Sequence, residues 1–197
     1  QGSRLSLWLD NRFTKPYPFW FIQYLLKKQP LTFLLSKGYS LLVMTVFMVF
    51  NNSGDYDWRV LSVGVVFSLI GVITIAQAHH LFEKEQLSLF NNLPLLPLIR
   101  VRNWFITFSI ILTPEVIVLI RYFPLEQGWD KLLGLLFLML VFPLTVLSYQ
   151  HMDNLDKDEL MKAGLSITLL FFFLTLFSIP PLFITLACLA LSATIIR

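Results

Sequence analysis

Residues 79–103, HHLFEKEQLSLFNNLPLLPLIRVRN, lie between two long apolar runs of the chain, 60–78 and 104–120. Charged residues gather at both ends of this segment, and an amphipathic stretch with an Asn-Leu-Pro turn lies between them. The segment is too polar to enter the hydrocarbon core of a bilayer, and it is too apolar for an idle linker. We therefore expect an element that docks at a membrane surface.

The composition points to an integral membrane protein. Apolar residues make up 56% of the chain and charged residues 14%, and Phe occurs 19 times. A soluble globular protein has about 25% charged residues, so this chain has too little polar surface to cover a soluble core. The regular apolar–polar alternation of a membrane barrel is missing. We expect an all-α membrane protein.

The apolar runs predict about six transmembrane helices, because a bilayer core of about 30 Å needs about 20 helical residues. Residues 163–196 would form a helix of about 51 Å, too long for one span, and Pro180 and Pro181 interrupt it. Two short helices in a hairpin fit better, with a pair of re-entrant segments as the alternative. The expected spans are 31–50, 60–78, 104–120, 132–149, 163–178 and 182–196, in one transmembrane domain over 31–197.

Basic residues indicate the orientation, because Lys and Arg are retained on the cytoplasmic side. With the N-terminus inside, the outer segments hold only Arg59, Arg121 and Lys131. We expect both termini and segment 79–103 to be cytoplasmic, in a cell membrane. The inner segments hold Arg4, Arg12, Lys15, Lys27, Lys28, Lys84, Arg100, Arg102, Lys157, Lys162 and Arg197.

The N-terminal segment, 1–30, is expected to be cytoplasmic and interfacial. Residues 16–28, PYPFWFIQYLLKK, combine aromatic residues with two terminal lysines, as in a helix that lies in the headgroup layer. An aromatic belt at the start of the first span is the alternative.

Histidines are the only candidates for a metal or haem site, since Cys188 is the single cysteine. His79, His80 and His151 come at expected helix ends, but adjacent histidines on a helix diverge by about 100°, and no further ligand completes a set. We interpret them as polar helix-end residues. No catalytic motif and no phosphate-binding glycine loop is found, so we expect neither a cofactor nor enzyme activity of the chain itself.

Glu115 is the candidate intramembrane polar residue, and it follows Pro114, which can kink the helix. A buried carboxylate in a span faces the protein interior. It either lines a substrate path or gate, or it closes a local break or pairs with a neighbour for folding alone. Desolvation favours the neutral form of such a carboxyl group unless a cation or several hydrogen-bond donors compensate. Lys37, in the first span, is expected to extend its ammonium group to the inner interface.

An amphipathic docking helix is predicted near the start of segment 79–103. Helical spacing places several apolar residues near one face, with charged and amide residues largely elsewhere. A loop that lies on lipid without a partner is the alternative. The candidate docking residues are Phe82, Glu83, Glu85, Leu89, Phe90 and Leu93.

The order of these elements resembles the six-helix permease subunits of type-2 ATP-binding-cassette exporters. The resemblance rests on residues 82–85 (FEKE), 89–94 (LFNNLP), 100–104 (RVRNW) and Pro114-Glu115. It implies a coupling helix between spans two and three that docks on a separate ATPase subunit, and a homodimer or heterodimer of permeases. It also implies a bacterial inner membrane.

Two other function classes stay open at this point. One is a structural or assembly subunit that binds other membrane spans, and the other is a haem-binding or catalytic membrane protein. Co-purification with an ATP-binding subunit or a Soret absorption band would separate them. The net charge of +3 follows from the asymmetry of the loops, and we do not interpret it as nucleic-acid binding.

Overall fold

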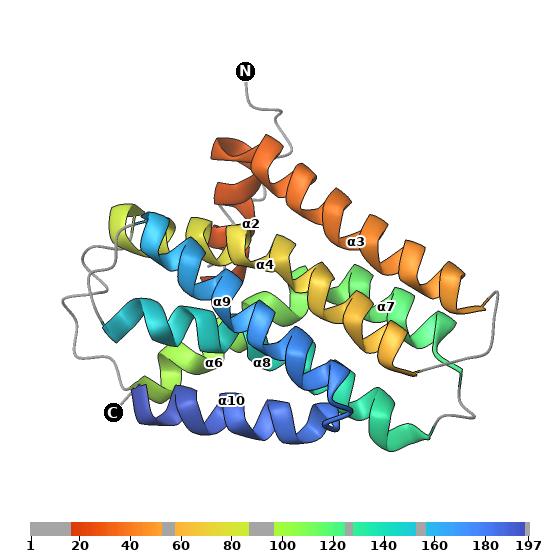
Figure 1. The fold of residues 1–197 in the computed structure, drawn as a ribbon. Helices are drawn as coiled ribbons and strands as arrows, with labels where there is room; N and C mark the ends of the chain where they lie inside the picture. Colours follow the sequence, from red (N-terminus) through yellow and green to blue (C-terminus); the bar gives the residue numbers. More distant parts are fainter. Residues whose placement is uncertain (1–16, 53–57, 87–96, 125–127, 153–156, 196–197) are drawn as a thin grey trace.

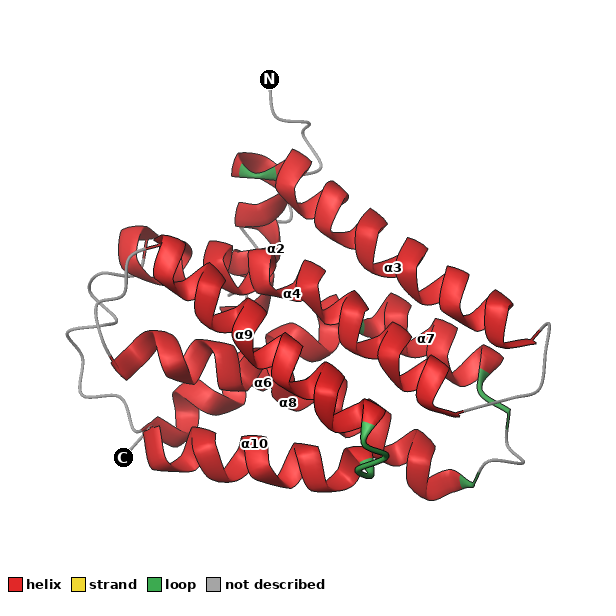
Figure 2. Ribbon diagram, in the orientation of Figure 1, coloured by secondary structure: helices red, strands yellow, loops and turns green. Residues whose placement is uncertain are grey.

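The computed structural model describes residues 17–52, 58–86, 97–124, 128–152 and 157–195. Every regular element in these ranges is a helix (Figures 1 and 2). The prediction of an all-α protein is therefore confirmed for this part of the chain. The helices are α2 (Tyr17–Lys28), α3 (Pro30–Asn52), α4 (Trp58–Gln86), α6 (Pro97–Ile111), α7 (Thr113–Tyr122), α8 (Trp129–Met152), α9 (Lys157–Leu176) and α10 (Pro181–Ile195).

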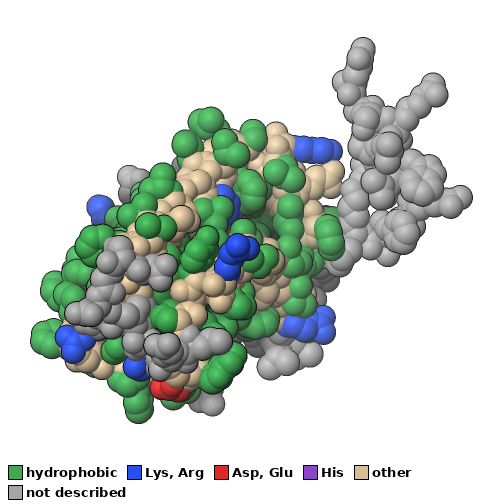
Figure 3. All heavy atoms as spheres, turned by 90° about the vertical axis from the view of Figure 1, so that its right-hand side faces the viewer, with side chains coloured by type: hydrophobic (Ala, Val, Ile, Leu, Met, Phe, Trp, Pro, Cys, Tyr) green, Lys and Arg blue, Asp and Glu red, His purple; other side chains and the backbone are tan. Residues whose placement is uncertain are grey.

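Three of the described helices, α3, α4 and α8, are long and apolar enough to cross a membrane. The bent pair of α6 and α7 qualifies as a fourth crossing if it is counted as one span. Helices α9 and α10 are apolar, but their apolar parts are shorter. Seen from one end of the bundle, many hydrophobic side chains lie on the surface of the described residues, with scattered basic groups between them (Figure 3). These features are those of a multi-pass membrane protein.

The long helices lie side by side, whereas α2 crosses their direction at one end of the bundle (Figure 1). Helix α4 is central: it contacts α3, α8 and α9, and 78% of its apolar window is buried. Helix α3 lies at the edge, with 28% of its window buried. Helix α10 packs mainly against α8. The apolar core is therefore built around α4 and α8.

The second span is longer than its predicted range of 60–78, because α4 continues to Gln86. The prediction ended the span at residue 78 because the residues from His79 onward are largely polar, as is typical of the membrane interface. In the folded chain α2 and α6 cover this part of α4, so that Phe82 is 4% exposed and Glu83 is 7% exposed. The rest of the predicted docking stretch, 87–93, lies outside the described residues.

Helix α6 begins at Pro97, and the chain is bent by 58° between α6 and α7. Pro114 lacks an N–H, so one helical hydrogen bond is missing at this position. The helix resumes with the Val116 N–H, which donates to Leu112 O at 3.0 Å. The predicted kink at Pro114 is confirmed. Proline does not interrupt every helix of the bundle, because α8 continues through Pro143.

The turn between α9 and α10 lies at residues 177–180, close to the predicted break at the proline pair. The Ser178 N–H donates to Thr175 O and the Ile179 N–H to Leu174 O, each at 3.1 Å. With φ 63° at Ser178, this is the hydrogen-bond pattern of a Schellman motif. The motif satisfies carbonyl groups at the end of α9, and the prolines stop the helix from continuing.

Candidate functional site

Glu83 is the centre of a buried polar cluster between α2, α4 and α6. Its Oε1 accepts a hydrogen bond from the Tyr17 hydroxyl at 2.6 Å and another from Trp104 Nε1 at 2.9 Å. Tyr17 begins α2 and Trp104 lies in α6, so one carboxylate oxygen joins three helices. A hydrogen bond to a charged group contributes about 1.5–3 kcal/mol. We call Tyr17, His79, Glu83 and Trp104 the anchor cluster.

His79 completes the anchor cluster from one turn earlier on α4. Its Nε2 lies 3.2 Å from the Tyr17 oxygen. Because Tyr17 has a single hydroxyl proton and donates it to Glu83, Nε2 must be the protonated nitrogen and must donate to Tyr17. Hydrogen bonds thus run from His79 through Tyr17 to Glu83. The other ring nitrogen, Nδ1, is buried without a hydrogen-bond partner.

Aromatic rings enclose the His79 side chain, which is fully buried. The ring of Phe21 lies 4.6 Å from it in an edge-on arrangement, and that of Phe108 lies 5.8 Å away. The expectation that His79 is a polar helix-end residue is therefore wrong, because α2 and α6 cover it. Among the described residues no group of three or more His, Cys, Asp and Glu side chains could hold a metal ion.

The Tyr17 hydroxyl stays a hydrogen-bond donor at physiological pH. Burial, and next the negative charge of Glu83, raise the pKa of Tyr17 well above its usual value of about 10, although the positive charge of Arg100 opposes this. A neutral phenol can donate its proton to Glu83, whereas a phenolate would repel the carboxylate. The link between α2 and α4 therefore does not depend on pH in the neutral range.

A second polar site joins α3 to α7 near the bend in the third span. Lys37 Nζ lies 2.7 Å from Glu115 Oε1 in an ion pair. Glu115 is fully buried, and its Oε2 has no hydrogen-bond partner. The predicted pairing of Glu115 with a neighbour is confirmed by this ion pair, whereas its role in folding or transport stays a prediction. The Lys37 ammonium group lies against Glu115 instead of extending to the inner interface as predicted.

The structure places only part of the predicted docking set. Phe82 and Glu83 both point into the bundle, where Phe82 packs against the rings of Tyr17, Phe21 and Tyr24. Docking by these residues stays a prediction. The Glu85 side chain, Leu89, Phe90 and Leu93 lie outside the described residues, as does the His151 side chain.

The sequence did not predict the roles of Tyr17, which was assigned to an interfacial helix, and of Trp104, which was placed at the start of the third predicted span. The available signal was the spacing of His79 and Glu83, four residues apart at the end of an apolar run. Residues at this spacing share one helix face, and a polar pair on a covered face needs partners from other helices. Buried tyrosine and tryptophan commonly supply such donors.

No known protein family, curated protein or solved structure matches this chain.

Proposed function

We propose that the chain is a permease subunit of an ATP-driven transporter, which receives mechanical work from a separate ATPase subunit through residues 87–96. The observation that carries the proposal is the anchor cluster. Glu83 lies one turn before the end of α4, and its partner Trp104 lies two turns into α6. Residues 87–96 connect these two helices. A protein that receives work at this connection needs both of its ends held together, and the cluster does this.

Helix α2 belongs to the same mechanical unit. Tyr17 ties its first turn to Glu83, and Phe21 and Tyr24 pack their rings against Phe82. Because α2 lies across the ends of the other helices (Figure 1), a displacement of residues 87–96 would move α2, α4 and α6 as one body. A single flexible loop would absorb the displacement instead. This rigid connection favours a coupling role over a loop that merely lies on lipid.

The second polar site supplies a continuation of this path into the membrane. Helix α6 runs from the anchor cluster to the 58° bend, and Glu115, directly after the bend, is paired with Lys37 on α3. A change in the bend angle would therefore reach α3 through this ion pair. We propose that α6 transmits motion from residues 87–96 to α3 and α7. A bent span with a buried charge pair is a suitable hinge for alternating access.

The proposal includes six crossings with both termini in the cytoplasm of a bacterial inner membrane. Helices α3, α4, α6–α7, α8, α9 and α10 follow one another in alternating directions (Figure 1), which supports six crossings. Lys27, Lys28, Lys84, Arg100 and Arg102 belong to the end with α2, which would be the cytoplasmic end.

Thiol labelling tests this orientation in a Cys188→Ser background. Cysteines introduced at Asp55 and Gln127 should react with an impermeant reagent added outside, whereas cysteines at Gln86 and Asp156 should react only after the membrane is opened. Labelling of the Gln86→Cys variant from outside would reverse the orientation and remove the docking hypothesis.

Co-purification with the ATPase subunit tests the function itself. We expect an ATP-hydrolysing subunit to be recovered with the intact chain from its native membrane. A photo-crosslinking amino acid at Leu89 or Phe90 should attach to that subunit. The charge reversal Glu85→Lys should weaken the association or uncouple hydrolysis from transport. Truncation of an aromatic residue at the centre of an interface commonly costs more than about 1 kcal/mol, so Phe90→Ala should do the same.

Two further variants separate docking from folding. Glu159→Lys reverses an exposed charge on α9 and is the matched control, which should leave the association unchanged. Glu83→Lys would disrupt the buried anchor cluster and should reduce the yield of folded protein before it affects docking. Recovery of an intact, inserted chain with other membrane proteins but no ATPase would overturn the permease proposal in favour of a structural or assembly subunit.

A further inference from the structure

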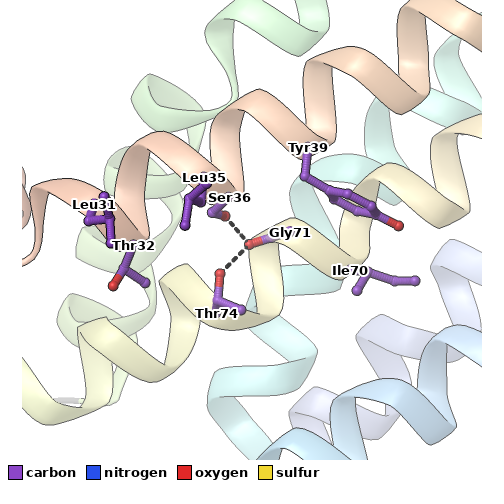
Figure 4. Close-up of a pocket in the computed structure, with 8 residues that line it drawn as sticks. All are labelled: Leu31, Thr32, Leu35, Ser36, Tyr39, Ile70, Gly71 and Thr74. Carbon is purple, nitrogen blue, oxygen red and sulfur yellow. Dashed lines mark hydrogen bonds between the residues drawn. The ribbon is translucent and has the colours of Figure 1, made fainter.

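A groove of about 370 Å³ lies between α3 and α4 on the outer side of the bundle (Figure 4). Helix α3 is the edge helix, so the groove opens away from the core. Both helices are candidate membrane spans, and a groove on their outer side therefore faces lipid. Its lining residues are Leu31, Thr32, Leu35, Ser36 and Tyr39 from α3, and Ile70, Gly71 and Thr74 from α4.

The two helices meet closely at Gly71. A Cβ at this position would lie 2.7 Å from the backbone oxygen of Ser36, which is closer than side chains approach. The hydroxyl groups of Ser36 and Thr74 both donate to Gly71 O, so they do not offer their protons to the groove (Figure 4). The floor of the groove is thus rigid and nearly apolar. Such a surface suits a hydrocarbon chain better than a polar ligand.

Two exposed lysines, Lys27 and Lys28, lie at the end of α2 that leads into α3. Across this junction the Gln29 N–H donates to Leu25 O at 3.0 Å and the Phe33 N–H donates to Gln29 O at 3.1 Å. Gln29 alone separates the two helices, and its backbone is hydrogen-bonded to both of them. Because the junction is this short, the lysines lie close in the chain to Leu31, the first groove residue of α3.

The charge of this region is of one sign. Residues 11–54 contain no Asp or Glu, so the lysines at the junction have no acidic neighbour in their own stretch of chain. The exposed face of α2 also carries Phe19, Trp20 and Leu26. Aromatic residues together with lysines are typical of a helix at the headgroup level of a membrane. A phosphate group at this level would meet positive charge.

We propose that the groove holds an acyl chain of an anionic phospholipid whose phosphate group binds to Lys27 and Lys28. The apolar groove accounts for the chain, and the lysines at its end account for the headgroup. The lipid would lie in the leaflet that contains α2. The site requires only that the chain spans a membrane, so it does not depend on the proposed permease function.

Lipid retention measured by native mass spectrometry tests the site. The full chain is reconstituted in bilayer discs of equal parts phosphatidylglycerol and phosphatidylcholine and is then released into a mild detergent. We expect the wild type to retain phosphatidylglycerol in preference to phosphatidylcholine. In the double variant Lys27→Gln/Lys28→Gln this preference should fall roughly tenfold, because each basic side chain near an anionic lipid surface contributes to the attraction. Arg121→Gln, at the other end of the bundle, should keep it.

A pair of tryptophan substitutions on α3 tests the groove separately from the charges. Leu35 and Leu42 are both 63% exposed, but only Leu35 lines the groove. We expect Leu35→Trp to reduce the retention of phosphatidylglycerol several-fold, whereas Leu42→Trp should leave it unchanged. Equal retention of the two lipids by the wild type, or unchanged preference after loss of both lysines, would overturn the proposal. If Leu35→Trp instead converts a dimer of chains into monomers, a second copy occupies the groove and the lipid proposal fails.

Discussion

Glu83 and Glu115 are both buried carboxylates on helices of the bundle, but their surroundings differ. Glu83 accepts hydrogen bonds from a phenol and an indole, which come from two other helices. Glu115 has one cation, Lys37, and its second oxygen is without a partner. Two donors on separate helices define the position of the first carboxylate more tightly than a single ammonium group defines the second.

The difference suggests how rigidity is distributed along the molecule. Where several neutral donors meet one carboxylate, the loss of one donor leaves another in place, so the junction of α2, α4 and α6 should move as a unit. Between α3 and α7 the described polar link is one ion pair. In its low-dielectric surroundings the attraction between the two charges is strong, and the loss of one partner leaves a buried charge at a large cost in stability. We therefore expect the anchor cluster to tolerate single changes better than the ion pair does.

The largest effect is expected from Lys37→Met. The substitution leaves Glu115 buried without its cation, and the loss of one partner of a buried ion pair costs about 3–5 kcal/mol. The free energy of unfolding in mixed detergent micelles measures this cost.

The double variant Lys37→Met/Glu115→Leu is the control for this prediction. It removes both charges, so most of the lost stability should return. A single Lys37→Met variant that is as stable as the wild type would show that the pair has no structural role. If the double variant is stable but transport is lost, the pair acts in the substrate path or gate.

A somewhat smaller loss is expected from Glu83→Leu. This change leaves the Trp104 N–H buried without an acceptor, at roughly 1–3 kcal/mol, whereas the Tyr17 hydroxyl can donate to His79 Nε2 in the other tautomer of that ring. The same unfolding measurement applies, with the exposed Glu159→Leu as its control. Trp104→Phe should cost less than Glu83→Leu, because Tyr17 still donates to the carboxylate. An equal cost for the two variants would show that the Trp104 hydrogen bond alone stabilises the cluster and that Tyr17 contributes nothing.

The contact between α3 and α4 provides a third comparison, with two glycines as a matched pair. An added methyl group at Gly71 would meet the Ser36 backbone, so Gly71→Ala should force the helices apart and cost about 1–3 kcal/mol. Gly38 has no atoms within 4 Å of the added position, and Gly38→Ala should stabilise α3 slightly through its higher helix propensity. Equal effects of the two substitutions would show that α3 and α4 are not in close contact at Gly71.

The smallest effect is expected from Tyr17→Phe, about 1.5 kcal/mol at neutral pH, at the lower end of the range for a hydrogen bond to a charged group because Trp104 still donates to Glu83. The folded protein keeps the Tyr17 proton, since burial raises the pKa, whereas the unfolded chain releases it above about pH 10. The corresponding stabilisation is complete below pH 10 and decreases as the pH rises above it. The wild type should therefore lose stability more steeply than Tyr17→Phe between pH 10 and pH 11. Parallel curves would mean that Tyr17 is not buried against Glu83.

The sequence alone predicted much of the fold for local reasons. Apolar runs of sufficient length predicted the helices, because a helix satisfies its own backbone groups wherever it lies in a membrane. Pro114 and the pair Pro180-Pro181 predicted the bend and the final hairpin, because a missing N–H acts at its own position. The end of α4 was predicted too early, since His79 and Glu83 are polar and only their coverage by α2 and α6 explains their burial.

What the sequence by itself determined is therefore the helical class, the apolar segments and the positions of the breaks. Only the tertiary structure decided which polar side chains meet. Tyr17 and Glu83 are 66 residues apart in the chain, and Lys37 and Glu115 are 78 residues apart. Hydropathy and local spacing report how a residue suits water or lipid, but they do not report which other helix will face it. The packing of α2 and α6 against α4, and of α7 against α3, makes that choice, because a buried polar group is stable only where another element supplies its partner.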